Sequence, residues 1–171
     1  MERVAEPQSS SMPNLTSDGW GPIQVGMSRD ELEAVAGALP PLGDPRGRDD
    51  CEIVHPSGAP TGLEVMLWSG RVASVWVGTD AIRTAEGLGV GATAEEIRAR
   101  YGARVTQRGH EYSEHPAEYL DIVTTRVAHA DDGGFDAYAD VRGVSFHIGE
   151  DGRAYLVAGG DGSIQSVEGC A

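Results

Sequence analysis

The chain has no lysine, few aromatic residues and a large excess of acidic side chains. All thirteen basic residues are arginines, against 27 acidic residues, and the formal net charge is −14. Such a surface is a poor partner for nucleic acid, because phosphate binding requires clustered cations. A basic protein surface or a basic small molecule is electrostatically easier to bind. Solubility alone also explains an acidic surface.

Long apolar runs are absent too, which excludes a membrane-spanning helix of about 20 apolar residues. No segment shows the charged, apolar and small-residue layout of a secretory signal. The chain has 171 residues, of which 40% are hydrophobic. This size suits one domain, or two small halves that share a core.

Cysteine is scarce: Cys51 and Cys170 are the two in the chain, and they match no metal-binding spacing. They are either two free, buried thiols or one disulfide that joins the middle of the chain to its end. We favour the disulfide. Closing so long a loop would stabilise the fold by about 4–5 kcal/mol in the chain-entropy model. It would also indicate an oxidising compartment, so we expect a secreted, periplasmic or cell-surface protein.

One short pattern occurs twice, 65 positions apart, as GPIQVGMSRDELEAVAG (21–37) and EGLGVGATAEEIRARYG (86–102). In each copy a hydroxyl residue precedes a glutamate by three positions, at 28–31 and 93–96. This spacing predicts a capping box at the start of a helix. A glycine closes each copy, where a helix end often requires a left-handed residue.

Both predicted helices are short, so each needs a partner surface to be stable. Alternating or β-branched segments follow each of them and predict strands. They are 51–55, 62–68, 71–77, 118–125, 143–148 and 153–158, with 163–170 as a last strand or extended tail. Order and composition therefore predict an α+β fold: two tandem repeats, each a helix followed by antiparallel strands, forming one curved sheet with helices on one face. Residues 1–19 would be a flexible leader, 20–82 repeat 1 and 83–171 repeat 2.

The duplicated pattern resembles the beta-lactamase inhibitory proteins and the small outer-membrane assembly lipoproteins that share the single-repeat fold. The resemblance lies mainly in IQVGMSRDEL (23–32) and more weakly in VGATAEEI (90–97). It implies an exported, non-catalytic protein that binds proteins through its sheet and loops. The inhibitory proteins usually have a disulfide within each repeat and aromatic-rich sheets. Here one long-range cysteine pair and 6% aromatic residues depart from that pattern.

No segment predicts catalysis, because no serine lies in a G-x-S-x-G motif and no histidine is placed beside a nucleophile. The stretch GHEYSEHPAEY contains His110 and His115 between glutamates. Its spacing differs from the zinc motif H-E-x-x-H, and Pro116 argues against a helix there. We therefore predict no metal, no cofactor and no enzyme activity.

A binding surface is the remaining hypothesis. In the strand 62–68, Glu64 and Met66 point away from the apolar side chains between them, and Trp76 can share their face. A one-residue change of hairpin register would reverse this assignment. Aromatic anchors are typical of interfaces. The candidate binding residues are Glu64, Met66, Trp68, Trp76, Tyr112, Tyr119 and His147.

The sequence thus predicts a non-catalytic, exported binding module whose partner is a protein or peptide, favourably one with a basic surface. Two alternatives stay open. One is a small cell-envelope hydrolase with a site between the repeats, which would require a deep cleft with perturbed carboxylates or histidines. The other is a structural lipoprotein domain without a tight ligand, whose sheet would be uniformly polar.

Overall fold

The computed structural model describes residues 11–40, 50–126, 141–166 and 170. The elements, in chain order, are β1 (Leu15–Thr16), β2 (Gly19–Trp20), β3 (Ile23–Gln24), α1 (Arg29–Ala36), β4 (Cys51–Val54), β5 (Leu63–Trp68), β6 (Arg71–Val77), α2 (Ala94–Tyr101), η1 (Gly102–Arg104), β7 (Val105–Gly109), β8 (Glu118–Arg126), β9 (Val141–Ile148), β10 (Ala154–Gly160) and η3 (Gly162–Gln165).

The predicted fold class, an α+β arrangement of two helix-plus-strand repeats, is wrong. The described residues are 42% strand and 17% helix, with two α-helices. They form two sheets, one of three strands and one of seven. The two helix signals in the sequence are correct, but each α-helix has only eight residues, so helices make up a small part of the fold. Strands β1 to β3 have two residues each, too few for an alternating pattern to reveal them.

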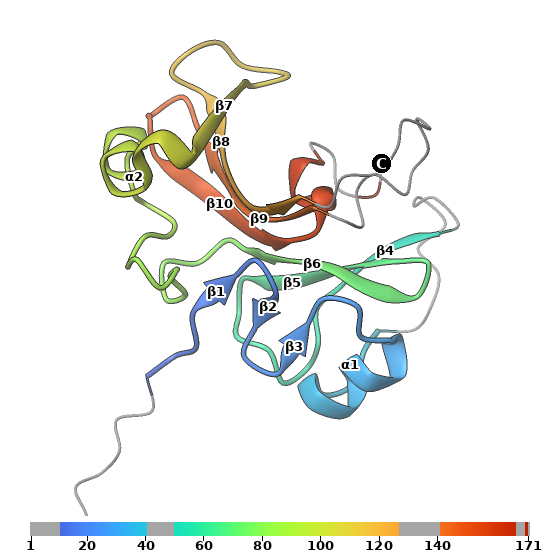
Figure 1. Cartoon of the computed structure of the whole chain (residues 1–171). Coiled ribbons are helices and arrows are strands. Elements are labelled where there is room, and N and C mark those ends of the chain that lie inside the picture. The colour runs from blue at the N-terminus through green and yellow to red at the C-terminus, as the bar shows by residue number, and fades with distance from the viewer. Residues whose placement is uncertain (1–10, 41–49, 127–140, 167–169, 171) are drawn as a thin grey trace, which may run out of the picture.

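The large sheet has the strand order β4-β5-β6-β10-β9-β8-β7, and neighbouring strands are antiparallel (Figure 1). Strands β6 and β10, far apart in sequence, join the two groups of strands. Their register runs from Val157↔Val77 to Gly160↔Ser74. At this junction β1 lies so close that a Cβ on Gly159 would be 2.2 Å from the Thr16 carbonyl oxygen. Leu15 of β1 is buried, although it falls in the segment predicted to be a leader.

Both predicted capping boxes are confirmed. The Ser28 Oγ accepts from the Glu31 backbone N–H at 3.2 Å, and the Glu31 carboxylate accepts from the Ser28 N–H at 2.8 Å. Thr93 and Glu96 make the same pair of bonds at 3.1 and 2.8 Å. Each cap contributes on the order of 1 kcal/mol to helix stability. The duplicated pattern therefore encodes two equivalent helix starts.

An arginine joins each helix start to a neighbouring strand. The Arg71 guanidinium donates to the Gly26 carbonyl oxygen at 2.9 Å, and Arg153 donates to the Gly91 carbonyl oxygen at 2.8 Å. Gly26 and Gly91 have positive φ values of 93° and 92°. A residue without Cβ adopts this conformation readily. The glycine that both copies of the pattern share thus directs its carbonyl toward an arginine, at the beginning of β6 in one copy and just before β10 in the other.

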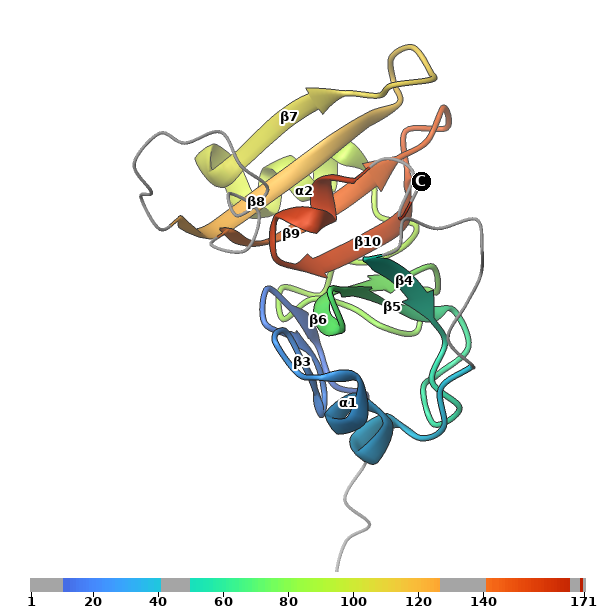
Figure 2. The same ribbon diagram turned by 90° about the vertical axis from the view of Figure 1, so that its right-hand side faces the viewer.

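The two faces of the large sheet are covered differently. Figure 2 shows α2 behind the sheet and η3 in front of β9 and β10. The helix face packs on α1, α2 and the small sheet through a large apolar core. Among its fully buried members are Ile23, Leu32, Leu63, Val65, Val75, Ile97, Leu120 and Phe146. A smaller cluster on the opposite face contains Met66, Trp76, Ala158 and Ile164.

The predicted disulfide is confirmed: Cys51 of β4 is bonded to Cys170, and their Cα atoms are 5.4 Å apart. It attaches the C-terminal end of the chain to the sheet on the face opposite the helices. Within the described residues, no helix combines the length and the apolar character that crossing a membrane requires.

Replacing both cysteines by serine is expected to lower the free energy of unfolding by up to about 5 kcal/mol, because the sequence separation of 119 residues closes a long loop in the unfolded chain. Urea denaturation of the double variant measures this. The wild-type chain with and without reductant is the matched control. A loss below about 1 kcal/mol would show that the unfolded chain gains little freedom when the bond is absent.

Candidate functional site

The sheet face opposite the helices carries an unusual group of aromatic and polar side chains, and we call it the aromatic face. Trp76, Tyr119, His147 and Tyr155 define it. The His147 ring lies edge-on to Tyr119 at 4.8 Å and to Trp76 at 5.5 Å between centroids. Because β6, β10, β9 and β8 are consecutive in the sheet, register brings these residues together from four strands.

The chain's own C-terminal segment covers much of this face. Ile164 of η3 is fully buried against it. Ser163 Oγ donates to Ser74 Oγ at 2.8 Å, and His147 Nε2 donates to the Ile164 carbonyl oxygen at 3.4 Å. The disulfide at Cys170 holds the same segment farther along. The central part of the aromatic face is therefore an interior.

Asp121 is the centre of the polar contacts beneath this segment. Its side chain is fully buried, and Arg108 binds both of its carboxylate oxygens. Ser145 Oγ donates to it at 2.6 Å and Gln165 Nε2 at 3.0 Å. Arg108 also lies 4.7 Å above the ring of Tyr119. A buried carboxylate with a charged partner and two further donors is fully satisfied.

Ser145, His147 and Asp121 share this face but do not form a nucleophilic triad. A triad needs the serine to donate to the histidine and the histidine to the carboxylate. Here Ser145 donates directly to Asp121, while the Nε2 of His147 faces a backbone carbonyl. All three side chains are buried. Their arrangement stabilises the fold and leaves no hydroxyl for a substrate.

The structure places the predicted binding residues in different environments. The register Glu64↔Trp76 and Met66↔Ser74 confirms that these side chains share one face. Met66, Trp76, Tyr119 and His147 are buried, Trp68 is half-buried, and Glu64 and Tyr112 are exposed. The buried four contribute to the interior of the aromatic face. A binding role for any of the seven stays a prediction.

Exposed aromatic side chains gather at the rim, where the β7–β8 connection meets β10. We call the half-buried His110 and the exposed Tyr112 and Tyr155 the aromatic patch. Tyr112 is 65% exposed and Tyr155 is 48% exposed. The backbone N–H of Tyr112 donates to His110 Nδ1 at 3.2 Å, so a neutral ring carries its proton on Nε2, which lies 3.4 Å from the Tyr155 hydroxyl. His110 also stacks on Tyr119 at 4.9 Å.

The sequence did not identify His110 and Tyr155 as binding residues. His110 was considered as a metal ligand. Within the described residues, no group of three His, Cys, Asp or Glu side chains could hold a metal ion. Tyr155 lies where the β9–β10 register shifts between Ala154 and Leu156, so simple strand alternation misplaces it. The alternation of apolar and polar residues in the sequence does not reveal such a register shift.

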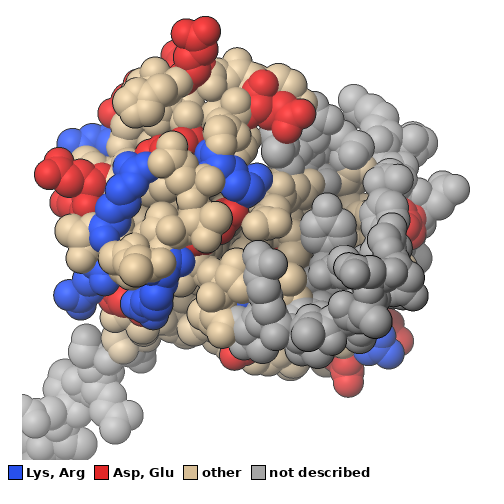
Figure 3. All heavy atoms as spheres, turned by 45° about the horizontal axis from the view of Figure 1, so that its top comes forward, with Lys and Arg blue, Asp and Glu red and all other residues tan. Residues whose placement is uncertain are grey.

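Arginine side chains gather on the part of the surface that carries α2 and β7, on the left in Figure 3, with acidic side chains around them. Arg98 of α2 binds the Glu118 carboxylate at 2.7 Å and Gln107 of β7 at 3.2 Å. Arg104 lies 5.1 Å over the Tyr101 ring. This local concentration of cations contrasts with the acidic composition of the whole chain.

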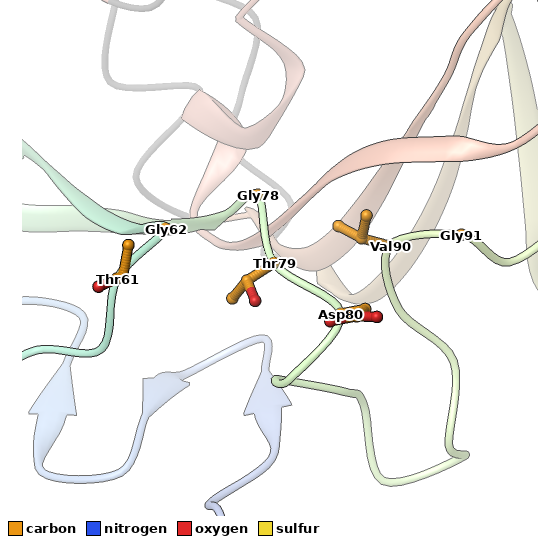
Figure 4. Close-up of a pocket in the computed structure, with 7 residues that line it drawn as sticks. All are labelled: Thr61, Gly62, Gly78, Thr79, Asp80, Val90 and Gly91. Carbon is orange, nitrogen blue, oxygen red and sulfur yellow. The ribbon is translucent and has the colours of Figure 1, made fainter.

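A shallow pocket of about 530 Å³ lies between the ends of the β5–β6 hairpin and the segment that leads to α2 (Figure 4). It is lined by Thr61, Gly62, Gly78, Thr79, Asp80, Val90 and Gly91. Asp80 is the one titratable side chain among these lining residues. The pocket occupies the position that a site between the two halves would have, and it offers one carboxylate and two hydroxyls.

No known protein family matches the sequence, and no curated protein does. The structure is similar to the 1.5 Å crystal structure of an extracellular protein containing an SCP domain from Bacillus anthracis str. Ames. The TM-score is 0.48 at 10% sequence identity, and the match covers 94% of this chain and 49% of that one. The chain thus spans about half the length of that structure.

Burial lowers the pKa of His147 to about 4, from an ordinary value of 6.5. Asp121, Arg108 and His110 are the charged or titratable groups that act on it. As the pH falls, His147 is therefore protonated in the unfolded chain before it is protonated in the folded one. The free energy of unfolding is expected to fall by up to about 3 kcal/mol as the pH decreases from 6.5 to 4. We measure the free energy of unfolding at several pH values in this range, and its dependence on pH should be weaker in His147→Phe than in the wild type. His115→Phe, at an exposed histidine, should retain the wild-type slope.

Arg108→Met is expected to lower the free energy of unfolding by about 3–5 kcal/mol, because it leaves the fully buried carboxylate of Asp121 without its cation. Arg100→Met is the matched control at an exposed arginine and should change stability by less than about 0.5 kcal/mol. Chemical denaturation of both variants measures the difference. Equal losses in the two variants would contradict a structural role for the Arg108–Asp121 pair.

Proposed function

We propose that this chain is a non-catalytic, exported module that binds a protein or peptide. The binding surface consists of the aromatic patch (His110, Tyr112, Tyr155) and the adjoining edge strand β7. The observation that supports this proposal best is a pair of exposed tyrosines beside His110, whose ring contacts the Tyr112 backbone N–H and the Tyr155 hydroxyl. Tyrosine side chains are enriched at interfaces because they combine a large apolar area with a hydroxyl and little rotamer entropy.

The base of the aromatic patch is rigid, which favours binding. His110 stacks on the buried Tyr119, whose hydroxyl is hydrogen-bonded to the backbone of Glu111. Tyr119 in turn lies between the His147 ring and the Arg108 guanidinium. A surface that is already ordered loses less entropy on association. The buried aromatic residues would thus support the exposed ones.

Export to an oxidising compartment is supported by the Cys51–Cys170 disulfide. The chain would be secreted, periplasmic or attached to the cell surface. The resemblance of the two capped segments to the beta-lactamase inhibitory proteins supports a role in binding proteins and stays a proposal. A partner with a basic surface is favoured only by the net charge of −14, and the charge beside β7 has the opposite sign.

Tyr112→Ala/Tyr155→Ala is expected to weaken partner binding by at least about 30-fold, because two interface anchors are removed from one patch. The measurement is affinity capture from the secreted and envelope proteins of the source organism, followed by titration calorimetry of the captured protein. Val35→Ala shortens another exposed apolar side chain, 42% accessible, on α1. It should bind like the wild type.

The proposal fails if the double tyrosine variant captures and binds the same proteins as the wild type with unchanged affinity. Thermal unfolding of both variants provides the necessary control for folding. Because both tyrosines are about half exposed or more, their truncation should change stability by less than about 1 kcal/mol.

A further inference from the structure

Within the described residues, strand β7 (Val105–Gly109) is an edge of the seven-stranded sheet and pairs with β8 alone. Its register runs without a shift from Val105↔Ile122 to Gly109↔Glu118. Thr106, Gln107 and Gly109 are exposed. In such a strand every second residue directs its backbone N–H and C=O away from the sheet. As far as the described residues go, the outer side of β7 therefore presents donors and acceptors that no other strand pairs with.

Proteins commonly protect such an edge with proline, charged side chains (above all lysine), a bulge, or a helix or loop that covers it. The one charged residue of β7, Arg108, is paired with Asp121 on one face of the sheet. Strand β7 has no proline and no lysine, and its pairing with β8 contains no bulge. The other edge of the sheet differs, because the Cys51–Cys170 disulfide attaches the C-terminal segment to β4. Within the described part of the chain, β7 is the regular edge that lacks these protective features.

The charge beside β7 is positive. Residues 97–110 contain four arginines (Arg98, Arg100, Arg104 and Arg108) and no Asp or Glu, in a chain of net charge −14. Arg98 and Arg108 are paired with carboxylates of β8. No ion pair within 4 Å involves Arg100 or Arg104 among the described residues, although Arg104 lies close enough to Glu86 to help lower the pKa of that carboxyl. An arginine has five N–H donors, so the paired arginines also retain some.

Arg98 and Arg108 lie on opposite faces of the sheet at neighbouring levels of β7. Arg98 belongs to the helix face and reaches Gln107 there. Arg108 lies on the aromatic face, over Tyr119 and against Asp121. Successive side chains of an added strand would also point to alternate faces. Two acidic residues in adjacent positions would therefore each have a guanidinium on their own side.

We propose that β7 accepts an extended segment of a partner protein as an additional strand, and that this segment contains two adjacent acidic residues. The inference rests on the proposed binding function and names its mode and the chemistry of the partner. Backbone hydrogen bonds to the edge supply affinity, and alternate side chains supply specificity, as in other cases of strand addition. The aromatic patch lies just beyond the end of β7 and contacts the same partner.

A second copy of this chain is a less suitable occupant of the edge. Pairing of β7 with its own copy would bring Arg98 and Arg108 of both molecules together, and like charges across strands are destabilising. An acidic segment reverses the sign of this interaction. Sedimentation velocity over a range of protein concentrations tests the point, and a dimer that disappears in an edge variant would overturn the proposal.

Three fluorescein-labelled hexapeptides test the charge pattern: Thr-Val-Glu-Glu-Val-Thr, its isomer Thr-Glu-Val-Glu-Val-Thr and the neutral Thr-Val-Gln-Gln-Val-Thr. The first places its carboxylates on both faces, whereas the isomer places both on one face. Fluorescence anisotropy in about 0.15 M salt limits long-range repulsion by the acidic chain, since the Debye length is about 8 Å. We expect the adjacent-acid peptide to bind about three- to tenfold tighter than the other two.

Proline substitutions test the edge itself. Of the adjacent positions Thr106 and Gln107, one directs its N–H outward. Proline there should leave the thermal midpoint nearly unchanged and weaken binding of the adjacent-acid peptide by roughly tenfold or more, because a donor is lost and the ring obstructs pairing. Alanine at the same position retains the N–H and should bind within about twofold of wild type.

Amide hydrogen exchange of the wild-type chain gives an independent measurement. A saturating amount of the adjacent-acid peptide should slow exchange at the outward amide of Thr106 or Gln107. Unchanged exchange, or equal binding of all three peptides, overturns strand addition. If the peptides fail while the Tyr112→Ala/Tyr155→Ala variant still loses its natural partner, the proposed binding function stands and this inference alone is wrong.

Discussion

The pairing of β6 with β10 is the constraint on which the rest of the structure depends. It joins strands that are about 80 residues apart in the chain, Val77 with Val157 and Ser74 with Gly160, into one antiparallel sheet. Once that register is set, Trp76 lies beside the His147 and Tyr119 rings, and the apolar side chains of both strand groups face one core. The two faces of the sheet then differ in chemistry: the helix face carries the large apolar core, and the aromatic face contains the buried Arg108–Asp121 ion pair.

That division explains why charged and aromatic groups can be packed so closely on one face. Asp121 has no contact with water, yet Arg108, Ser145 and Gln165 satisfy its oxygens. Gln165 comes from η3, so part of this compensation depends on the segment that the disulfide attaches. The C-terminal segment and the ion pair therefore stabilise each other. The half-buried His110 and the exposed Tyr155 lie at the margin of this arrangement, next to solvent.

The sequence was informative where the cause of structure is local. Ser28 with Glu31 and Thr93 with Glu96 specify helix starts through bonds spanning three residues, and both were predicted correctly. Face assignment was also correct for Glu64 and Met66, because strand alternation is local; that Trp76 shares their face depends on a register shift between Met66 and Leu67, which the sequence did not reveal. The fold class was wrong, because two-residue strands such as Leu15–Thr16 form only through tertiary contacts. Burial of Tyr119 and His147 was missed for a related reason: η3 contacts His147, while His110 and Arg108 lie against the Tyr119 ring, and nothing in their own strands indicates these contacts.

Composition averaged over the chain and the charge close to β7 point to different partners. A net charge of −14 indicates a basic partner, but electrostatic attraction between exposed groups decays within about a Debye length, roughly 8 Å at physiological salt. A docking segment at β7 would therefore respond mainly to the arginines of residues 98–108, with the acids of more distant loops largely screened. The pairing of Arg98 with Glu118 and of Arg108 with Asp121 also fixes where these guanidinium groups lie, one on each side of the sheet. Structural ion pairs thus determine the charge pattern at the edge, and the contacts that hold α2 and β7 against β8 would select what can be added beside β7.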